Sequence, residues 1–248
     1  MNPRAVRRIL LINPNTSPEV TRRLVDHLQP HLPAGTELLS CTAAFGAPYI
    51  SCEASHAIAA HAVLRAWMQA PEADAVLIGC FGDPGLFALK DHAGVPVTGL
   101  AEASFIEAAR KGPFAVVTGG SRWKPMLQRL AHALGVANEL IHIETIAPTG
   151  ADLMADPVLA QICLSQACEA ARAKGANSII IGGAGLAGWA GQLQSLVDVP
   201  LIDSVESGLR VLLDEQIPTI APGARADLVQ WLPVKGHLQH AGSGPATQ

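Results

Sequence analysis

The sequence predicts an α/β protein of two pseudo-symmetric lobes, each a mostly parallel sheet flanked by helices, produced by an internal duplication. Short apolar runs alternate with helical patterns along the chain, an order typical of parallel sheets with helices on both faces. Residues 73–80 (ADAVLIGC) recur as residues 176–183 (ANSIIIGG), and the decisive chemical difference between the copies is Cys80 against Gly183. The positions that match after the two copies are Gly82 and Gly185, Gly85 and Gly188, Val95 and Val199, Pro96 and Pro200, and Glu102 and Glu206.

The apolar runs give the expected strands. They lie at residues 8–12, 37–41, 75–78, 95–98, 115–118, 140–145, 178–181 and 200–202. Helices are expected to begin where a capping residue precedes proline, and a capping box is expected from Thr16 and Glu19. The capping pairs are Ser17-Pro18, Asp83-Pro84 and Asp156-Pro157, the last opening a helix with a clear apolar stripe.

Each half therefore reads as strand, polar turn and helix, followed by strand, glycine-rich turn and helix. We expect residues 1–97, completed by 210–232, to form the first lobe and residues 98–209 to form the second. Residues 233–248 lack any periodicity and are expected to be a disordered tail.

Bulk composition excludes several classes of protein. Of 248 residues 49% are apolar and 15% charged, which is enough apolar material for strands buried on both faces. The net charge of −4 leaves no basic surface for nucleic acid, and every apolar run is too short to cross a membrane. We expect a cytoplasmic protein with a small-molecule partner; the sequence leaves a homo-oligomer open.

No metal or disulfide framework is expected. The chain has 5 cysteines at irregular spacing without a Cys-x-x-Cys pair. Among its 9 histidines, His56 and His61 are spaced so that they diverge on a helix, and His27 and His31 straddle Pro30.

Loops at the carboxyl ends of the strands are the expected ligand site, because open α/β sheets bind ligands there. These loops are residues 13–17, 80–85, 118–122 and 183–188, all polar or glycine-rich and set before helices. Their backbone N–H groups suit an anionic substrate oxygen, and the site is expected between the halves.

Cys80 is the residue expected to carry chemistry. It ends a strand before a turn into a helix, where the helix dipole favours a thiolate. The alternative is a buried cysteine packed as a small apolar residue, a reading we keep for Cys41, Cys52, Cys163 and Cys168. The polar residues of the other loops either cap helices or contact a ligand.

A rival pattern is a dinucleotide fingerprint at residues 183–188, Gly-x-Gly-x-x-Gly, with Asp203 at the end of the next strand. The pattern lies late in the chain. Its glycines at 185 and 188 are also explained by repetition of Gly82 and Gly85.

Several motifs together resemble the hydantoin racemase branch of the aspartate/glutamate racemase superfamily over about residues 8–210. They are LLINPNTS (10–17), LIGCFGDPGL (77–86), GLAEAS (99–104), VVTG (116–119) and VPLID (199–203). The resemblance implies two α/β lobes with the site between them, no metal, no cofactor, and two cysteines that transfer protons at an acidic carbon. The first of these cysteines falls on Cys80, and the second falls on Gly183.

The resemblance thus implies a cofactor-independent racemase or epimerase of hydantoin or amino-acid type whose second face lacks its thiol. Water or substrate tautomerism would serve that face. The catalytic positions are Cys80 and Gly183, and the substrate contacts are expected from Asn13, Asn15, Thr16, Phe81, Thr118, Gly119, Ser121, Ala184 and Gly185. The alternatives are a single-cysteine decarboxylase of the arylmalonate type and a ligand-binding protein without turnover.

Overall fold

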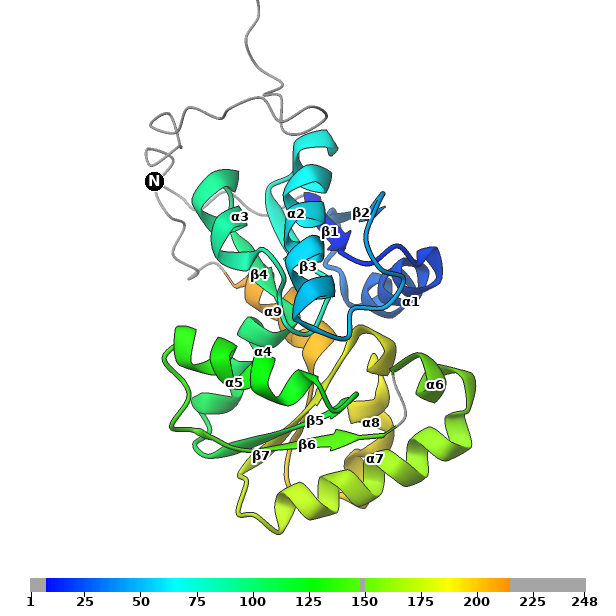
Figure 1. Cartoon of the computed structure of the whole chain (residues 1–248), viewed down its shortest axis with the longest axis vertical. Helices are drawn as coiled ribbons and strands as arrows, with labels where there is room; N and C mark the ends of the chain where they lie inside the picture. The colour runs from blue at the N-terminus through cyan, green and yellow to red at the C-terminus, as the bar shows by residue number, and fades with distance from the viewer. Residues whose placement is uncertain (1–7, 148–149, 215–248) are drawn as a thin grey trace, which may run out of the picture.

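A computed structural model describes residues 8–147 and 150–214, and it contains two four-stranded parallel sheets of matching topology (Figure 1). The strand orders are β2-β1-β3-β4 and β6-β5-β7-β8, so the second sheet repeats the first. The strands are β1 (Arg8–Asn13), β2 (Glu37–Thr42), β3 (Ala75–Ile78), β4 (Val97–Gly99), β5 (Phe114–Gly119), β6 (Leu140–Ile146), β7 (Ser178–Gly182) and β8 (Leu201–Asp203). The predicted α/β fold of two lobes is confirmed.

Every expected strand is present, with shifted ends. The strands β4 and β8 begin at Val97 and Leu201, after the prolines that were included in the prediction, because proline has no N–H to donate to a neighbouring strand. The segment 215–232, expected to complete the first lobe, and the tail 233–248 lie outside the described residues.

Helices connect the strands in both lobes (Figure 1). The α-helices are α1 (Pro18–Leu28), α2 (Glu53–Gln69), α3 (Leu86–Ala93), α4 (Leu100–Ala109), α5 (Trp123–Ala133), α6 (Gly150–Ala155), α7 (Pro157–Arg172), α8 (Trp189–Leu193) and α9 (Ser204–Leu213). Short 3₁₀ turns are η1 (Gln29–His31), η2 (Ala184–Leu186) and η3 (Gln194–Leu196).

The strands send alternate side chains into different cores, as the two-residue period of a strand requires. Leu11 of β1 and Val116 of β5 face one central core, which both sheets share. Leu10 faces an outer core of the first lobe, and Val117 faces an outer core of the second. The inner faces of the two sheets are therefore joined by one continuous apolar core.

The helices α4 and α9 lie between the lobes and exchange sheets (Figure 1). Helix α4 follows β4 of the first sheet and contacts β7 of the second, whereas α9 follows β8 and contacts β3 and β4 of the first. The two helices also pack against each other, with Phe105 and Leu209 both buried in the central core. Each lobe thus contributes one helix that packs against the sheet of the other lobe.

Helix caps differ from the expectation at two places. Ser17 caps α1 by accepting from Val20 N at 3.5 Å, but Thr16 does not form the expected capping box and instead donates its N–H to Ala47 O. Asp156 caps α7 as expected, accepting from Leu159 N at 3.0 Å.

Asp83 caps a different helix from the one expected. It adopts φ 50°, a left-handed conformation that aspartate tolerates better than most residues. Its carboxyl turns to the start of α4 and accepts from Ala101 N at 3.0 Å and Glu102 N at 2.6 Å. In the second lobe Asp203 caps α9, accepting from Val205 N at 2.8 Å.

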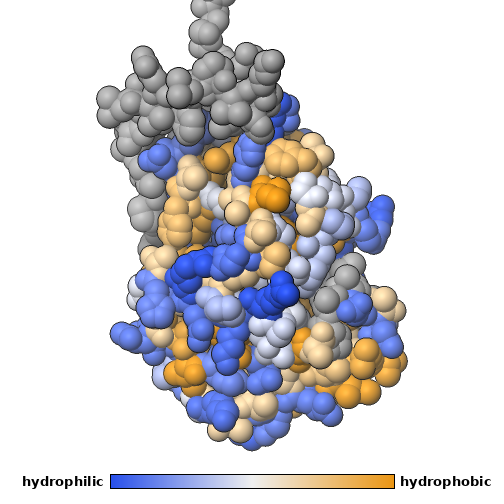
Figure 2. Space-filling view, in the orientation of Figure 1, coloured by the Kyte–Doolittle hydropathy of each residue, from blue (hydrophilic) through white to orange (hydrophobic). Residues whose placement is uncertain are grey.

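The surface is mixed in polarity (Figure 2), and within the described residues no helix is long and apolar enough to cross a membrane. Apolar side chains gather at the lower right edge of this view, over the start of α7. Val158 and Ile162 there are 70% and 51% exposed.

Candidate active site

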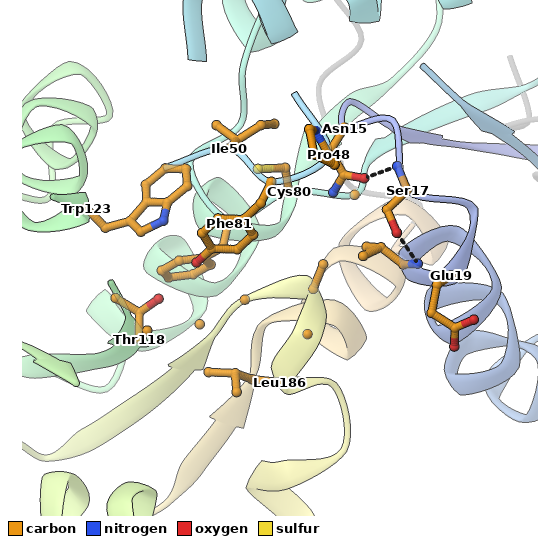
Figure 3. A pocket seen from close by; sticks show the side chains of 18 residues that line it. Asn15, Ser17, Glu19, Pro48, Ile50, Cys80, Phe81, Thr118, Trp123 and Leu186 are labelled. Atoms are coloured by element: carbon orange, nitrogen blue, oxygen red, sulfur yellow. Dashed lines mark hydrogen bonds between the residues drawn. The ribbon is translucent and has the colours of Figure 1, made fainter. Parts of the chain in front are cut away.

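A cavity of about 280 Å³ opens between the lobes at the carboxyl ends of β1, β3, β5 and β7 (Figure 3). This is the position expected from the parallel sheets. The first lobe contributes Asn15, Ser17, Glu19, Val20, Pro48, Tyr49, Ile50, Gly79, Cys80 and Phe81 to the cavity wall. The second lobe contributes Thr118, Gly119, Trp123, Gly182, Gly183, Ala184, Gly185 and Leu186.

Most of the predicted site residues come together here. Those that line the cavity are Cys80, Gly183, Asn15, Phe81, Thr118, Gly119, Ala184 and Gly185. Three others do not line it. Asn13 is buried beneath Asn15, Thr16 bonds through its backbone to Ala47, and Ser121 is exposed on the surface at the start of α5.

Cys80 lies in the upper wall of the cavity, facing the loop 182–186 of the second lobe (Figure 3). Cys80 is 8% exposed. Among the described residues that line the cavity, it carries the one thiol. Burial raises the pKa of this thiol well above its usual range, and the nearby Asp83 carboxylate raises it further.

The expectation of a thiolate favoured by a helix dipole is therefore wrong. Helix α3 begins at Leu86, and the turn of residues 81–85 separates Cys80 from its first N–H groups. The dipole effect fades within the first turn of a helix, so burial and the Asp83 charge decide the pKa of Cys80. The resting side chain is a thiol.

The pKa of the Asp83 carboxyl is also shifted from its usual value. Burial raises the pKa of its carboxyl to about 7, although the two backbone N–H groups of α4 oppose this effect. A group that titrates near neutral pH thus lies beside Cys80.

A network of amides shapes the loop after β1. Asn13 Nδ2 donates to Asn15 Oδ1 at 3.0 Å and to Thr21 Oγ1 at 2.9 Å. Asn15 Oδ1 also accepts from Ser17 N at 2.9 Å, a bond drawn in Figure 3. These bonds occupy the amide oxygen of Asn15, so the nitrogen of this amide is the atom suited to a substrate oxygen.

Large apolar side chains form one wall of the cavity. Tyr49 and Ile50 follow β2, and Trp123 opens α5. Figure 3 shows Ile50 and Trp123 beside Cys80. The indole of Trp123 covers Gly82 so closely that any side chain at position 82 would collide with it. The Gly82 carbonyl is also bonded to His56 Nε2 at 2.9 Å, which fixes the loop that carries Cys80.

The two duplicated loops touch across the cavity. The ring of Phe81 lies against Gly182, where a Cβ would collide with it. Phe81 also meets Phe105 of α4 edge to face, with ring centroids 5.9 Å apart. Glycine at 182 is thus needed for the close approach of the lobes.

Gly183 has a backbone that side chains rarely adopt. Its φ is +146°, whereas Cys80 is not among the described residues with positive φ. A Cβ at 183 would have room, with its nearest neighbour Leu186 Cγ at 3.5 Å. The barrier to a side chain here is backbone strain rather than space.

The geometry does not support the dinucleotide fingerprint. Asp203 is 4% exposed and its carboxyl oxygens accept from Gly188 N at 2.6 Å, Val205 N at 2.8 Å and Glu206 N at 3.2 Å. These bonds hold the loop and cap α9, so the carboxylate is not presented to a ribose hydroxyl.

The apolar wall of the cavity and several residues at its edge were not predicted from the sequence. The residues not anticipated are Glu19, Val20, Pro48, Tyr49, Ile50, Gly79, Trp123 and Gly182. One signal was available for Tyr49, which is the single tyrosine of the chain and follows the end of a strand. In Figure 3 the carboxyl of Glu19 points away from Cys80, and it pairs with Arg22.

The chain matches the family model described as Asp/Glu/hydantoin racemase over residues 9–212. It is 36% identical to the hydantoin racemase of Paenarthrobacter aurescens, with 82% of this chain and 89% of that protein covered. Among solved structures, the allantoin racemase of Klebsiella pneumoniae is 32% identical with a TM-score of 0.78, covering 83% of this chain and 85% of that one. The allantoin racemase of Pseudomonas fluorescens is 26% identical with a TM-score of 0.84, covering 91% and 100%.

Proposed function

The chain belongs to the Asp/Glu/hydantoin racemase family and is an isomerase, and we propose that it inverts the acidic ring carbon of a 5-substituted hydantoin through the thiol of Cys80. The observation that carries this proposal is the position of Cys80, which among the described residues is the one thiol in the wall of the cavity between the lobes. The family relatives named as racemases act on small molecules, and a cavity of about 280 Å³ is of the size for one.

The apolar wall favours a substrate with an apolar substituent. Tyr49, Ile50 and Trp123 present mostly carbon surface, with the Tyr49 hydroxyl and the Trp123 indole N–H as their polar groups, whereas a ureido group needs hydrogen-bond partners for several N–H and C=O groups. An aromatic or branched aliphatic substituent would instead bury its surface against them. We therefore place hydantoins with such substituents before allantoin and before acidic amino acids.

The polar loops are suited to the hydantoin ring. The amide nitrogen of Asn15 and the backbone N–H groups near Thr118 and Gly119 would donate to the ring carbonyls. The glycine-rich segment 182–185 would let the ring approach the backbone from the second lobe.

The proposed step is a proton transfer. The Cys80 thiol, which is protonated at rest, first releases its proton to solvent. The resulting thiolate takes the proton from the ring carbon, so that the C–H bond breaks, an S–H bond forms, and the electron pair moves to the neighbouring carbonyl as an enolate. A water molecule beside Gly183 then protonates the carbon on the opposite face and leaves as hydroxide. For the other enantiomer the same steps run in reverse, and the Cys80 thiol is the donor.

This assignment is tested by single enantiomers of 5-benzylhydantoin, allantoin and glutamate in D₂O, with deuterium at the acidic carbon followed by NMR and inversion followed by optical rotation. In Cys80→Ser we expect both rates on the best substrate to fall by roughly 10²–10⁴-fold. Cys41→Ser, which removes a thiol outside the cavity wall, should leave them unchanged. Exchange and inversion that survive Cys80→Ser would exclude the proposed role of this thiol.

A decarboxylase of the arylmalonate type is the second candidate. The observation that favours it is that the described part of the chain places a single thiol, Cys80, in the cavity wall opposite the glycine at 183. In that reaction the bond to one carboxyl breaks, carbon dioxide leaves, and the Cys80 thiol protonates the resulting enediolate. Carbon dioxide release from phenylmalonate, with no exchange on any hydantoin, would select it. Tight binding of a hydantoin without exchange or decarboxylation would instead indicate a binding protein.

A further inference from the structure

Two histidines and two carboxylates meet on the side of the molecule where α1 packs against α9. His27 lies in the last turn of α1, His31 lies in η1, Glu206 lies in the first turn of α9, and Asp203 precedes that helix. Pro30 does not separate the histidines as the sequence implied. The 3₁₀ turn continues α1 directly, so the two rings lie on one face with their centroids 5.6 Å apart.

The nitrogen and oxygen atoms of this cluster converge. His27 Nε2 lies 3.4 Å from Glu206 Oε1 and 3.7 Å from Asp203 Oδ2, and His31 Nε2 lies 3.9 Å from Glu206 Oε1. One donor atom from each of His27, His31 and Glu206 falls within 4.8 Å of the other two.

A buried nitrogen in the cluster lacks a hydrogen-bond partner. His27 Nε2 is inaccessible to solvent, and within the described residues it makes no hydrogen bond. A buried polar atom without a partner is costly, so its retention points to a ligand that completes it. The nearby carboxylate oxygens lie too far away for a short hydrogen bond.

We propose that His27, His31 and Glu206 bind one divalent cation of the zinc class. The cation would link the end of α1 in the first lobe to the start of α9, the helix that follows the second sheet. Two imidazoles and a carboxylate are a typical zinc donor set, whereas magnesium and calcium prefer oxygen ligands alone. Bond lengths of about 2.0–2.2 Å set the donors of a tetrahedral zinc roughly 3.4 Å apart. The observed separations need a shift of His31 on the order of 1 Å, and this side chain is 48% exposed.

The charges around the site fit a dication. Glu206 turns Oε1 to the histidines, while its Oε2 pairs with Arg210 at 3.3 Å. Asp203 adds a second carboxylate close to His27, so two negative groups face the cation. The exposed edge of His31 leaves a path for the ion from solvent.

The site would also bear on the cavity. Asp203 holds Gly188 N at 2.6 Å, and His27 packs on Gly188, where a Cβ would lie 3.4 Å from its ring. Gly188 closes the loop that carries Gly183, and the other end of α1 supplies Ser17 and Val20 to the cavity wall. A cation here would fix both of these walls without touching the substrate.

The test uses the full chain in the Cys80→Ser background, so that the cavity thiol cannot bind metal and the result does not depend on the proposed catalysis. After chelator treatment, Zn²⁺ is titrated by calorimetry, Co²⁺ by its visible absorption, and Tm is recorded with and without Zn²⁺. We expect one Zn²⁺ per chain, the intense bands of tetrahedral Co²⁺, and a Tm increase of roughly 5–10 °C at Zn²⁺ concentrations near 100 times Kd.

Three variants assign the ligands. In His31→Gln and Glu206→Gln we expect Zn²⁺ to bind at least about tenfold more weakly and the Tm increase to be lost, since each removes one ligand. His132→Gln is the matched control, because its ring lies on α5 and bonds to Gln128 O at 2.8 Å. The proposal is overturned if wild-type-like chain binds no Zn²⁺, or if all three variants bind it equally.

Discussion

The carboxyl of Asp83 occupies the space that a side chain on Gly99 would need. A Cβ at Gly99 would collide with the Asp83 carboxyl group, which caps α4 from the loop after β3. In the repeat, Gly99 corresponds to Asp203, which caps α9 from the end of β8. Both α4 and α9 are therefore capped by a buried carboxyl. In the first lobe it comes from the loop after β3, and in the second lobe it comes from the residue directly before the helix.

This relationship predicts that the carboxyl that caps α4 can be supplied from position 99 instead of position 83. Gly99→Asp alone should lower the free energy of unfolding by about 2–4 kcal/mol through overpacking, and Asp83→Gly alone by about 1–2 kcal/mol through loss of the cap. The double variant supplies the cap from position 99, as Asp203 does in the second lobe, and should be more stable than Gly99→Asp. Urea unfolding of all four proteins gives the coupling energy, and purely additive losses would contradict the exchange of roles.

Asp83 also predicts a pH dependence of stability. Burial raises the pKa of this carboxyl from 3.8 to about 7, so the folded chain holds a proton that the unfolded chain releases. Stability from this group is present below about pH 4 and is lost as pH rises to about 7, by roughly 2–4 kcal/mol. Asp83→Asn should flatten the curve of unfolding free energy in that window, measured by urea titration at several pH values. An unchanged slope would mean that Asp83 is ionised throughout.

The strained backbone at Gly183 predicts opposite effects on stability and activity. Both Gly183→Ala and Gly183→Cys should lower the free energy of unfolding by about 1–3 kcal/mol, because φ is +146° there. The two variants share this strain and differ in the thiol. If the second face lacks an acid, Gly183→Cys should racemise at least about tenfold faster than Gly183→Ala. Equal rates in optical rotation would show that a thiol at 183 does not reach the substrate.

Trp123 is expected to set the preference for large substituents. Trp123→Phe should reduce kcat/KM for 5-benzylhydantoin by about 10-fold more than for 5-methylhydantoin, because the lost surface contacts only the larger group. Trp189→Phe is the control, since Trp189 is buried in the outer core of the second lobe, away from the cavity. An equal decrease in kcat/KM for both substrates would show that Trp123 supports the loop at Gly82 and does not contact the substituent.

The sequence predicted the sheets and the place of the site because both follow from local patterns. Apolar runs mark buried strands, and parallel strands bring their carboxyl ends to one edge, which placed Asn15 and Cys80 at the same cavity. Polar loop residues were harder. Asn13 and Asn15 have the same side chain two positions apart, yet one supports the loop and the other lines the cavity.

What the sequence could not predict depends on contacts between distant segments. The raised thiol pKa of Cys80 follows chiefly from burial, which depends on how distant segments pack over it. Asp83-Pro84 has the local form of a cap for the next helix, but tertiary packing turns the carboxyl to α4. Trp123 reaches the cavity only because α5 packs over Gly82.

The exchange of α4 and α9 between the lobes has a consequence for the origin of the chain. A single half on its own would leave exposed the apolar surface of its last helix that now packs against the other sheet. Two separate identical halves would therefore have to pair in order to cover these faces, and joining both copies in one chain makes that pairing permanent. Once the halves were fused, positions on opposite sides of the axis were free to diverge separately, which a symmetric pair does not allow. The difference between Cys80 and Gly183 is of this kind.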